Sequence, residues 1–220
     1  MNKRCENIKA VIFDMDGVII NSEKLWRKSF KLTNKKLKVY VPEKFRQSCS
    51  GIPFATNLQR MKTAYPDIDA ELYFNTAREI HNYLLETDKH LIKNGFFKLI
   101  SAIKEKNLKI GLCTSSTLPK VQSLFKKKNI PIEYFDAIIT GDQVKNGKPH
   151  PEPYLATCDL LKENPKDCLV LEDSINGIIS AYNAGTVPIM VLDIIRPNKE
   201  TKSKCVKIVK SLKSVLKFIW

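Results

Sequence analysis

The first segment that could do chemistry is Asp14-Met15-Asp16-Gly17, which directly follows the apolar run 8–13. Carboxylates just past the carboxyl end of a buried parallel strand lie where α/β folds bind ligands. If the strand continues, Asp14 and Asp16 point to the same side. One could then hold a metal or attack an electrophile while the other moves protons. A surface loop with an Asp-Gly turn would have the same sequence, so this segment alone leaves both interpretations open.

Two further clusters supply hydroxyls and a lysine. Thr114, Ser115 and Ser116 follow a second apolar run, just before an expected helix. Hydroxyls and free backbone N–H groups at a helix start can bind phosphate, although Ser and Thr are also ordinary helix caps. Lys148 stands in the segment GKPHP at 147–151, where the prolines disfavour regular structure and could position its charge. A solvated loop lysine is the alternative.

The fourth cluster is a pair of adjacent acids, Glu172 and Asp173, directly after the apolar run 168–171. Two acids at a strand end suit a hard cation, but acids also begin helices because the helix dipole favours them there. Gly177 and Ala181 in the following segment allow close packing of a helix against a sheet. Three separate apolar runs deliver polar clusters to one edge, in the order acid pair, hydroxyls, lysine and acid pair, so the four together favour a single site.

The elements that must position these clusters follow an α/β pattern. Short apolar runs rich in Val and Ile suit strands buried on both faces of a parallel sheet. These runs are 8–13, 108–113, 137–140, 168–171 and 187–192. Segments with helical spacing lie between the later runs, at 96–103 and 118–125. We therefore predict the α/β class, with a final edge strand at 206–209 and a helix at 212–219.

The gap between the first two runs is too long for one crossover helix, and it contains several polar-faced helical segments. We predict a core domain of residues 1–22 and 90–220 with an inserted helical domain of residues 23–89. Within the insertion, the segment 71–85 predicts a helix with one apolar stripe. That stripe comprises Leu72, Phe74, Ile80, Tyr83 and Leu84.

Composition excludes several classes of protein. The 220 residues are 43% hydrophobic, which excludes disorder over most of the chain. The net charge is +14, but arginines are few and scattered, so we expect a Lys-rich solubilising surface rather than a nucleic-acid face. The six cysteines show neither CxxC pairs nor zinc-type spacing with the histidines. No apolar run approaches the ~20 residues of a membrane span, and we expect a cytoplasmic protein with reduced thiols.

The four clusters, in this order, resemble the motifs of the haloacid dehalogenase (HAD) superfamily of phosphohydrolases: Asp-x-Asp, a Thr or Ser, a Lys and an acidic pair. Three segments are similar to the group that holds β-phosphoglucomutase and the 2-deoxyglucose-6-phosphate or hexitol phosphatases. They are FDMDGVIINSEKLW (13–26), KPHPEPY (148–154) and LEDSING (171–177). The resemblance spans essentially the whole chain. It implies a Rossmann-like parallel sheet core, with the inserted helices as a mobile cap that closes over the site.

The resemblance also implies roles for the acids. Asp14 would be the nucleophile that becomes an aspartyl phosphate. Asp16 would give a proton to the leaving alkoxide and then activate the hydrolytic water. Mg²⁺ would be held by Asp14, the backbone carbonyl of Asp16 and Asp173, with Glu172 bound through water or behind these ligands.

The remaining motif residues would bind the phosphoryl group beside the two aspartates. By the same resemblance, the Thr114 hydroxyl and the Ser115 N–H would hold phosphoryl oxygens, while Lys148 neutralises developing charge. Asp14, Asp16, Thr114, Ser115 and Lys148 would thus contact the substrate.

These roles predict a Mg²⁺-dependent phosphatase of small phosphomonoesters, such as sugar or sugar-alcohol phosphates. A β-phosphoglucomutase-like phosphomutase is the alternative, because it would use the same clusters. Relatives often carry Arg or Lys where this chain has Pro53, which favours hydrolysis. A dehalogenase would lack Asp16 and need no metal. We expect a monomer whose partner is a small phosphorylated metabolite, not nucleic acid or a membrane. A basic module that binds nucleic acid or membranes is the alternative from another class. It would bind with strong salt dependence, but it would leave the four clusters unexplained.

Overall fold

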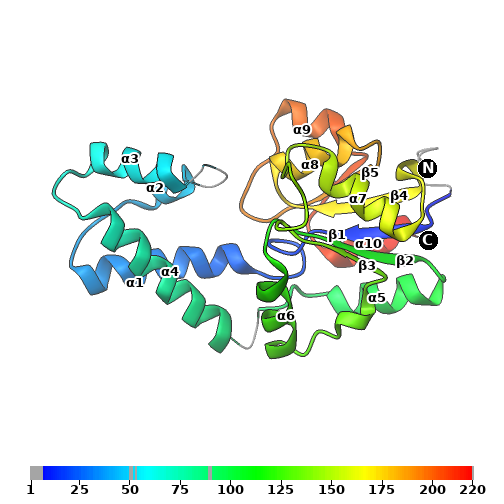
Figure 1. The fold of residues 1–220 in the computed structure, drawn as a ribbon, viewed down its shortest axis with the longest axis horizontal. Helices are drawn as coiled ribbons and strands as arrows, with labels where there is room; N and C mark the ends of the chain where they lie inside the picture. Colours follow the sequence, from blue (N-terminus) through cyan, green and yellow to red (C-terminus); the bar gives the residue numbers. More distant parts are fainter. Residues whose placement is uncertain (1–6, 50–51, 53, 89–90, 220) are drawn as a thin grey trace. The chain divides into compact units, whose positions relative to one another are not determined.

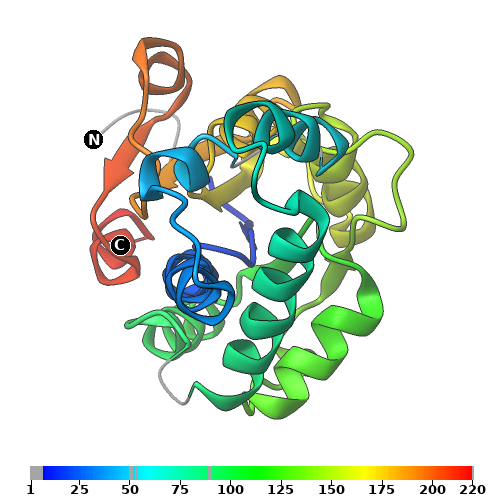
Figure 2. The same ribbon diagram turned by 90° about the vertical axis from the view of Figure 1, so that its left-hand side faces the viewer.

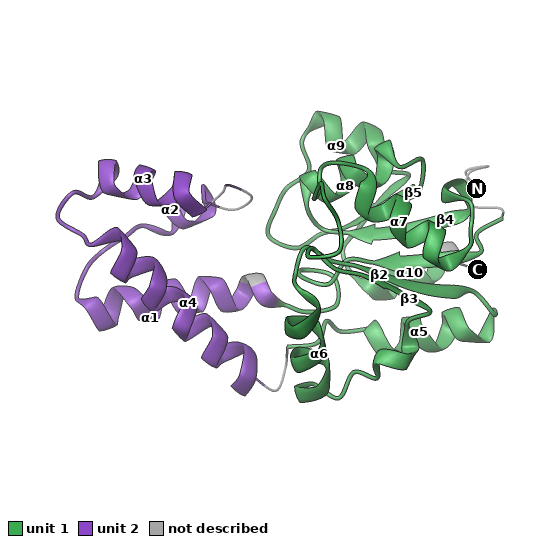
Figure 3. Ribbon diagram, in the orientation of Figure 1, with its two compact units in different colours: residues 1–21, 90–220 green, residues 22–89 purple. Residues whose placement is uncertain are grey.

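The computed structural model describes residues 7–49, 52, 54–88 and 91–219. The chain forms two compact units (Figure 3): residues 1–21 together with 90–220, and residues 22–89. Among the described helices, none has the length and apolar character needed to span a bilayer.

The larger unit is built on a six-stranded sheet in the order β3-β2-β1-β4-β5-β6. Its strands are β1 (Ala10–Phe13), β2 (Lys109–Cys113), β3 (Ala137–Ile139), β4 (Cys168–Glu172), β5 (Val187–Val191) and β6 (Lys207–Val209). Every neighbouring pair is parallel. All residues of β1, β4 and β5 are buried, as continuous apolar runs in a sheet covered on both faces require. The predicted α/β class is confirmed.

Helices cover both faces of this sheet (Figure 1). They are α5 (Phe96–Glu105), α6 (Leu118–Lys127), α7 (Glu152–Leu161), α8 (Ile175–Asn183), α9 (Lys199–Lys204) and α10 (Leu212–Ile219), with single 3-10 turns at Ile132–Tyr134 and Pro165–Asp167. Helix α7 packs on β2 and β3, and α8 packs on β4 and β5. On the opposite face, α5 packs against α10. The edge strand and final helix expected at the C-terminal end are both present.

The strand order reverses beside β1. The chain runs from β1 outward through β2 to β3, and then returns to β4 on the other side of β1. In such sheets, ligands bind outside the carboxyl ends of the strands at this switch point. The acid pair at 14–16, the hydroxyls at 114–116 and the acid pair at 172–173 all follow or end strands there.

The smaller unit is helical. It contains α1 (Ser22–Leu37), α2 (Glu43–Gln47), α3 (Phe54–Ala64) and α4 (Ala70–Thr87). Helices α1 and α4 pack side by side (Figures 1 and 2). The unit has its own apolar core, which contains Val41, Met61, Ala70, Tyr73 and Phe74. The Asp69 side chain caps α4 by accepting a hydrogen bond from Leu72 N at 3.0 Å.

The apolar stripe predicted for 71–85 is wrong at two positions. Leu72 is 52% exposed and Tyr83 is 66% exposed. The buried residues of α4 are Ala70, Tyr73, Phe74, Thr76, Ala77, His81, Leu84 and Leu85. Polar His81 completes this face because its ring stacks on Trp26, with centroids 3.8 Å apart and planes 13° apart. A search for apolar residues alone misses such a position.

The two segments that connect the units pair with each other inside the larger unit. Asn21 N donates to Leu91 O at 2.8 Å, and Lys93 N donates to Ile19 O, also at 2.8 Å. The Lys93 side chain forms a further ion pair with Asp193, which follows β5, at 2.7 Å. The larger unit therefore holds both crossing segments by backbone hydrogen bonds and one of them by an ion pair.

Candidate active site

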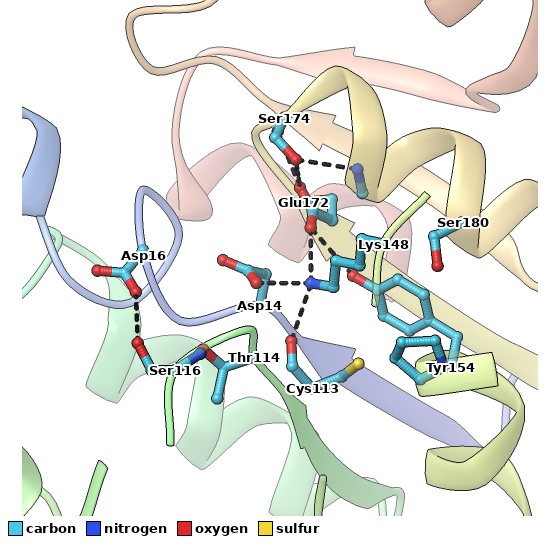
Figure 4. A network of polar contacts seen from close by, with 12 residues as sticks. Asp14, Asp16, Cys113, Thr114, Ser116, Lys148, Tyr154, Glu172, Ser174 and Ser180 are labelled. Carbon is cyan, nitrogen blue, oxygen red and sulfur yellow. Dashed lines mark hydrogen bonds and ion pairs between the residues drawn. The ribbon is translucent and has the colours of Figure 1, made fainter. Parts of the chain in front are cut away.

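Lys148, the third predicted cluster, contacts one residue of each of the two acid pairs (Figure 4). Its Nζ lies 2.7 Å from Asp14 Oδ1, 2.8 Å from Glu172 Oε1 and 3.0 Å from the Cys113 carbonyl oxygen. The lysine side chain is only 7% exposed, so it is not a solvated loop lysine. Burial lowers the pKa of Lys148, but the Asp14 and Glu172 carboxylates outweigh this and hold the pKa well above its ordinary value.

Asp14 and Asp16 follow β1 but make different contacts. Strand β1 ends at Phe13, so the expectation that both acids continue the strand is wrong. The chain instead turns at Gly17, whose N–H donates to Ile20 O at 2.7 Å and whose φ of +82° favours glycine. Asp16 consequently lies away from Lys148 and accepts a hydrogen bond from Ser116 Oγ at 3.3 Å (Figure 4).

Glu172 is buried and fully occupied by hydrogen bonds. Besides Lys148, its Oε1 accepts from the Tyr154 hydroxyl at 3.2 Å. Its Oε2 accepts from the backbone N and the Oγ of Ser174, at 2.8 and 2.9 Å. Ser174 also caps α8 by accepting from Gly177 N at 3.0 Å. The carboxylate therefore acts as an anchor behind Lys148.

Asp173 lies against the turn that follows Asp16. A Cβ atom built on Gly17 would overlap the Asp173 carboxylate, so only a glycine allows this close approach. Asp173 is 7% exposed. The two acid pairs, far apart in the sequence, therefore meet at the carboxyl ends of β1 and β4.

The hydroxyl cluster follows β2. Thr114 is buried, its N–H donates to Ile139 O at 3.0 Å, and its Oγ1 accepts from Ser116 N at 3.1 Å. Ser115 is exposed. The N-cap of α6 is Thr117, which makes no side-chain capping hydrogen bond. Thr114 and Ser115 are thus not the caps of this helix, and the capping interpretation of these two residues is wrong.

The buried carboxylates carry more negative charge than Lys148 compensates. Burial raises the pKa of Asp14 to about 8, opposed by Lys148 and supported by Glu172. Burial and the charges of Glu172 and Asp14 likewise raise the pKa of Asp173 well above its ordinary value. Such crowded acids either hold protons or need another cation.

The donor set fits Mg²⁺. Across residues 7–49, 52, 54–88 and 91–219, no group of three or more His, Cys, Asp or Glu side chains is arranged so that it could hold a metal ion by itself. Mg²⁺ does not need one, because it usually binds through one or two carboxylates and retains waters. The excess of buried negative charge around Asp14 and Asp173 is what a divalent cation would neutralise.

Residues 11–191 match the family model of haloacid dehalogenase-like hydrolases. The chain belongs to this family. The resemblance proposed from the sequence is confirmed, and the protein is a HAD-family hydrolase.

Named relatives of this HAD hydrolase include phosphatases. It is 32% identical over 181 residues to the phosphorylated carbohydrates phosphatase of Thermotoga maritima, covering 81% of this chain and 82% of the relative. It is 28% identical to pyrophosphatase PpaX of Bacillus cereus, covering 81% of each. A crystal structure of a putative β-phosphoglucomutase from Thermotoga maritima superposes with a TM-score of 0.80 and 27% identity, covering 97% of this chain and 100% of that one.

The contacts of three residues at the candidate site were not predicted from the sequence. Ser116 stood in the hydroxyl cluster, but nothing local indicated that it contacts Asp16. Ser174 and Tyr154 lie inside the segments 171–177 and 148–154, yet their contacts with Glu172 depend on how α7 and α8 pack. Only the segment similarity could have drawn attention to them.

Some residues singled out from the sequence cannot be followed in the fold. Gly51 and Pro53, where the basic residue is missing, lie outside the described residues, as do Cys5 and His90. The cysteines at 49, 113, 158, 168 and 205 are free thiols.

Proposed function

We propose that this hydrolase is a Mg²⁺-dependent phosphatase of small phosphomonoesters, such as sugar or sugar-alcohol phosphates. The observation that carries the proposal is the buried junction of Lys148 with Asp14 and Glu172. This junction supports the proposal because a buried positive charge lies beside Asp14, the proposed nucleophile, at the carboxyl edge of the sheet.

In the first half-reaction, an oxygen of Asp14 attacks phosphorus, and the bond between phosphorus and the leaving oxygen breaks. Asp16 gives its proton to that oxygen, so an alcohol leaves and Asp14 carries the phosphoryl group. Lys148 stabilises the charge on the transferring group, together with the Thr114 hydroxyl and the Ser115 N–H.

In the second half-reaction, the Asp16 carboxylate takes a proton from water while the water oxygen attacks phosphorus. The bond between phosphorus and Asp14 breaks, which releases phosphate and restores both acids. Glu172 keeps Lys148 aimed at Asp14 throughout, because its own position is fixed by Ser174 and Tyr154.

Asp14, the Asp16 carbonyl and Asp173 would hold Mg²⁺, with Glu172 behind them. When bound, the cation supplies positive charge to the transferring phosphoryl oxygens and lets the buried acids stay ionised. The four helices of residues 23–89 are proposed as the cap that excludes water and contacts the rest of the substrate. Residues 1–22 and 90–220 form the core in this proposal.

The substrate class follows the named relatives. The 32% identical relative is a phosphorylated carbohydrates phosphatase, which supports sugar phosphates first. Pyrophosphatase PpaX adds pyrophosphate as a second substrate to test. A phosphomutase is the alternative, favoured by the similarity to the putative β-phosphoglucomutase; it would pass the phosphoryl group to a second hydroxyl of the sugar instead of to water.

The test is phosphate release from sugar phosphates, polyol phosphates, nucleotides, phosphoglycolate and pyrophosphate, with Mg²⁺ and with excess chelator. Asp14→Asn serves as the blank. We expect Mg²⁺-dependent release that the blank loses. Release that persists in the blank or in chelator would contradict the proposal. Folded protein that only interconverts glucose 1-phosphate and glucose 6-phosphate would establish the mutase.

A further inference from the structure

Ser116 bridges Asp16 to a lysine that none of the four clusters contains. Ser116 Oγ lies 3.3 Å from Asp16 Oδ2 (Figure 4). On its other side, Lys120 Nζ lies 3.1 Å from the same Ser116 Oγ. The three polar groups thus form a continuous chain from the surface of α6 to the candidate acid.

The direction of both hydrogen bonds is fixed by the lysine. An ammonium group can only donate, so it occupies a lone pair of Ser116 Oγ. The hydroxyl proton of Ser116 then points to its other neighbour, Asp16 Oδ2, and this oxygen must accept. A proton on the Asp16 carboxyl group is therefore directed to Oδ1.

The backbone holds Ser116 in place from two sides. Its N–H donates to Thr114 Oγ1 at 3.1 Å, and its carbonyl accepts from Gly141 N at 3.0 Å. Gly141 lies so close that a Cβ atom there would overlap the Ser115 carbonyl. The backbone of Ser116 is therefore held by hydrogen bonds on both sides. Its hydroxyl can move only by rotation of the side chain.

Lys120 stands where helix electrostatics disfavour it. Helix α6 begins at Leu118 and has no acidic residue in its first turn. A cation there meets the positive end of the helix dipole. The helix dipole therefore does not favour a lysine in this position, although the Asp142 carboxylate, which accepts from Leu118 N at 3.1 Å, lies at the same helix end. The Lys120 ammonium group nevertheless lies within hydrogen-bond distance of Ser116 Oγ.

We propose that Lys120 and Ser116 are positioning residues that keep Asp16 Oδ2 as a hydrogen-bond acceptor and assign the transferable proton to Oδ1. This inference rests on the proposed function, because it assumes that Asp16 protonates the leaving oxygen. As the bond between phosphorus and that oxygen breaks, the Oδ1–H bond breaks and an O–H bond forms on the leaving group. Without the chain of hydrogen bonds, the proton divides between both oxygens and the carboxyl group rotates more freely.

The experiment compares two probes of similar shape whose leaving groups differ in acidity. Phenyl phosphate needs a proton for its leaving oxygen, whereas p-nitrophenyl phosphate leaves as a stable anion. The measured quantity is kcat/KM, which reports the steps up to phosphorylation of Asp14 and not the later hydrolysis. The variants are Ser116→Ala and Lys120→Met, with Ser116→Thr and Lys120→Arg as conservative partners. Lys126→Met removes an exposed charge from the same helix as a control.

We expect Ser116→Ala to lower kcat/KM for phenyl phosphate about tenfold more than for p-nitrophenyl phosphate, a fraction of the usual contribution of general-acid catalysis. Lys120→Met should act in the same direction with a smaller ratio. Ser116→Thr and Lys120→Arg should restore the wild-type ratio, and Lys126→Met should keep it. Because Lys120 is exposed, its variants test the inference even if Ser116→Ala folds poorly.

The inference and the proposed function fail in different ways. If the wild type hydrolyses both probes and loses activity in Asp14→Asn, but neither variant changes the ratio, the inference is wrong and the proposed function stands. An equal loss on both probes would make Ser116 a structural residue only and would also overturn the inference. If Asp14→Asn is as active as the wild type, the proposed function itself fails.

Discussion

Gly177 lies so close to Glu172 that a Cβ atom on the glycine would overlap the Glu172 carboxylate. The first turn of α8 is thereby packed directly onto the acid that anchors Lys148. We predict that Gly177→Ala displaces Glu172, destabilises the protein by about 1–3 kcal/mol and lowers turnover at least tenfold. Chemical denaturation and phosphate release measure the two effects.

Gly147→Ala is the matched control for this substitution. A Cβ atom at Gly147 would meet nothing within 4 Å, so the free energy of unfolding should change by no more than about 0.5 kcal/mol. Equal effects of the two substitutions would show that close packing against Glu172 is not the cause.

Lys148→Met should be severe for both stability and activity. It leaves the buried Glu172 carboxylate without its cation and removes the charge that opposes protonation of Asp14. Breaking a buried ion pair in this way costs about 3–5 kcal/mol. Turnover should fall at least ~100-fold, because the charge beside the transferring group is lost. Adding Glu172→Gln should recover part of the stability but none of the activity.

The control is Lys145→Met, which removes an exposed lysine from the same loop. If Lys148→Met and Lys145→Met gave the same denaturation curve, this would contradict the claim that the buried contacts of Lys148 with Asp14 and Glu172 stabilise the protein.

The pH dependence of stability follows from Asp14. In the metal-free protein, burial raises its pKa from 3.8 to about 8, although Lys148 opposes this and Glu172 and Asp16 add to it. Between these values the folded state keeps a proton that the unfolded state has lost. The contribution of Asp14 is therefore fully present below about pH 4 and is lost as pH rises through about 8.

Asp14→Asn should remove the part of the pH dependence of the unfolding free energy that Asp14 causes. With chelator present, the wild type minus variant difference in unfolding free energy should fall steadily as pH rises across that range. Mg²⁺ should stabilise the wild type most at the upper end, where Asp14 is ionised. A difference that grows with pH would contradict the assignment.

Tyr154 should act through its hydroxyl and its ring separately. Its OH donates to Glu172 Oε1 at 3.2 Å, and Lys148 Nζ lies 4.8 Å from the ring centre. Tyr154→Phe keeps the ring and should cost about 1 kcal/mol, with most turnover retained. Tyr154→Leu removes both contacts and opens space in the core, so it should cost clearly more stability and lower kcat. The measurements are thermal denaturation and kcat of both variants. Equal denaturation temperatures and equal kcat values for Tyr154→Phe and Tyr154→Leu would argue against a specific role of the ring.

The sequence predicted the framework because local signals sufficed there. Continuous apolar runs located the strands closely, and the clusters at 14–16, 114–116 and 172–173 followed from the points where three of these runs ended. Lys148 had no such signal, because it lies in a loop well beyond the end of β3. The strand after residue 137 stops at Ile139 rather than Thr140, because the backbone N–H of Thr140 donates to the Gln143 side-chain oxygen at 2.8 Å instead of to a neighbouring strand.

Tertiary contacts were beyond those signals. Lys148 and Asp14 are separated by 134 residues, and no local pattern announces their contact. The turn at Gly17 redirects Asp16 away from the strand line, which the alternation of strand side chains could not reveal. In the helical unit, His81 stacks on Trp26 and lies on the buried face of α4. A search for apolar residues alone could not place a histidine on that face.

The site of phosphorylation tests the proposed mechanism most directly. Asp16→Asn should slow hydrolysis of the aspartyl phosphate, because no carboxylate then activates water, while p-nitrophenyl phosphate still phosphorylates the protein without needing an acid. Acid quenching after mixing this variant with labelled p-nitrophenyl phosphate and Mg²⁺, followed by peptide mapping, should put the label on Asp14 in near-stoichiometric amount. Release of p-nitrophenol with no labelled protein, or label on another residue, would contradict Asp14 as the nucleophile.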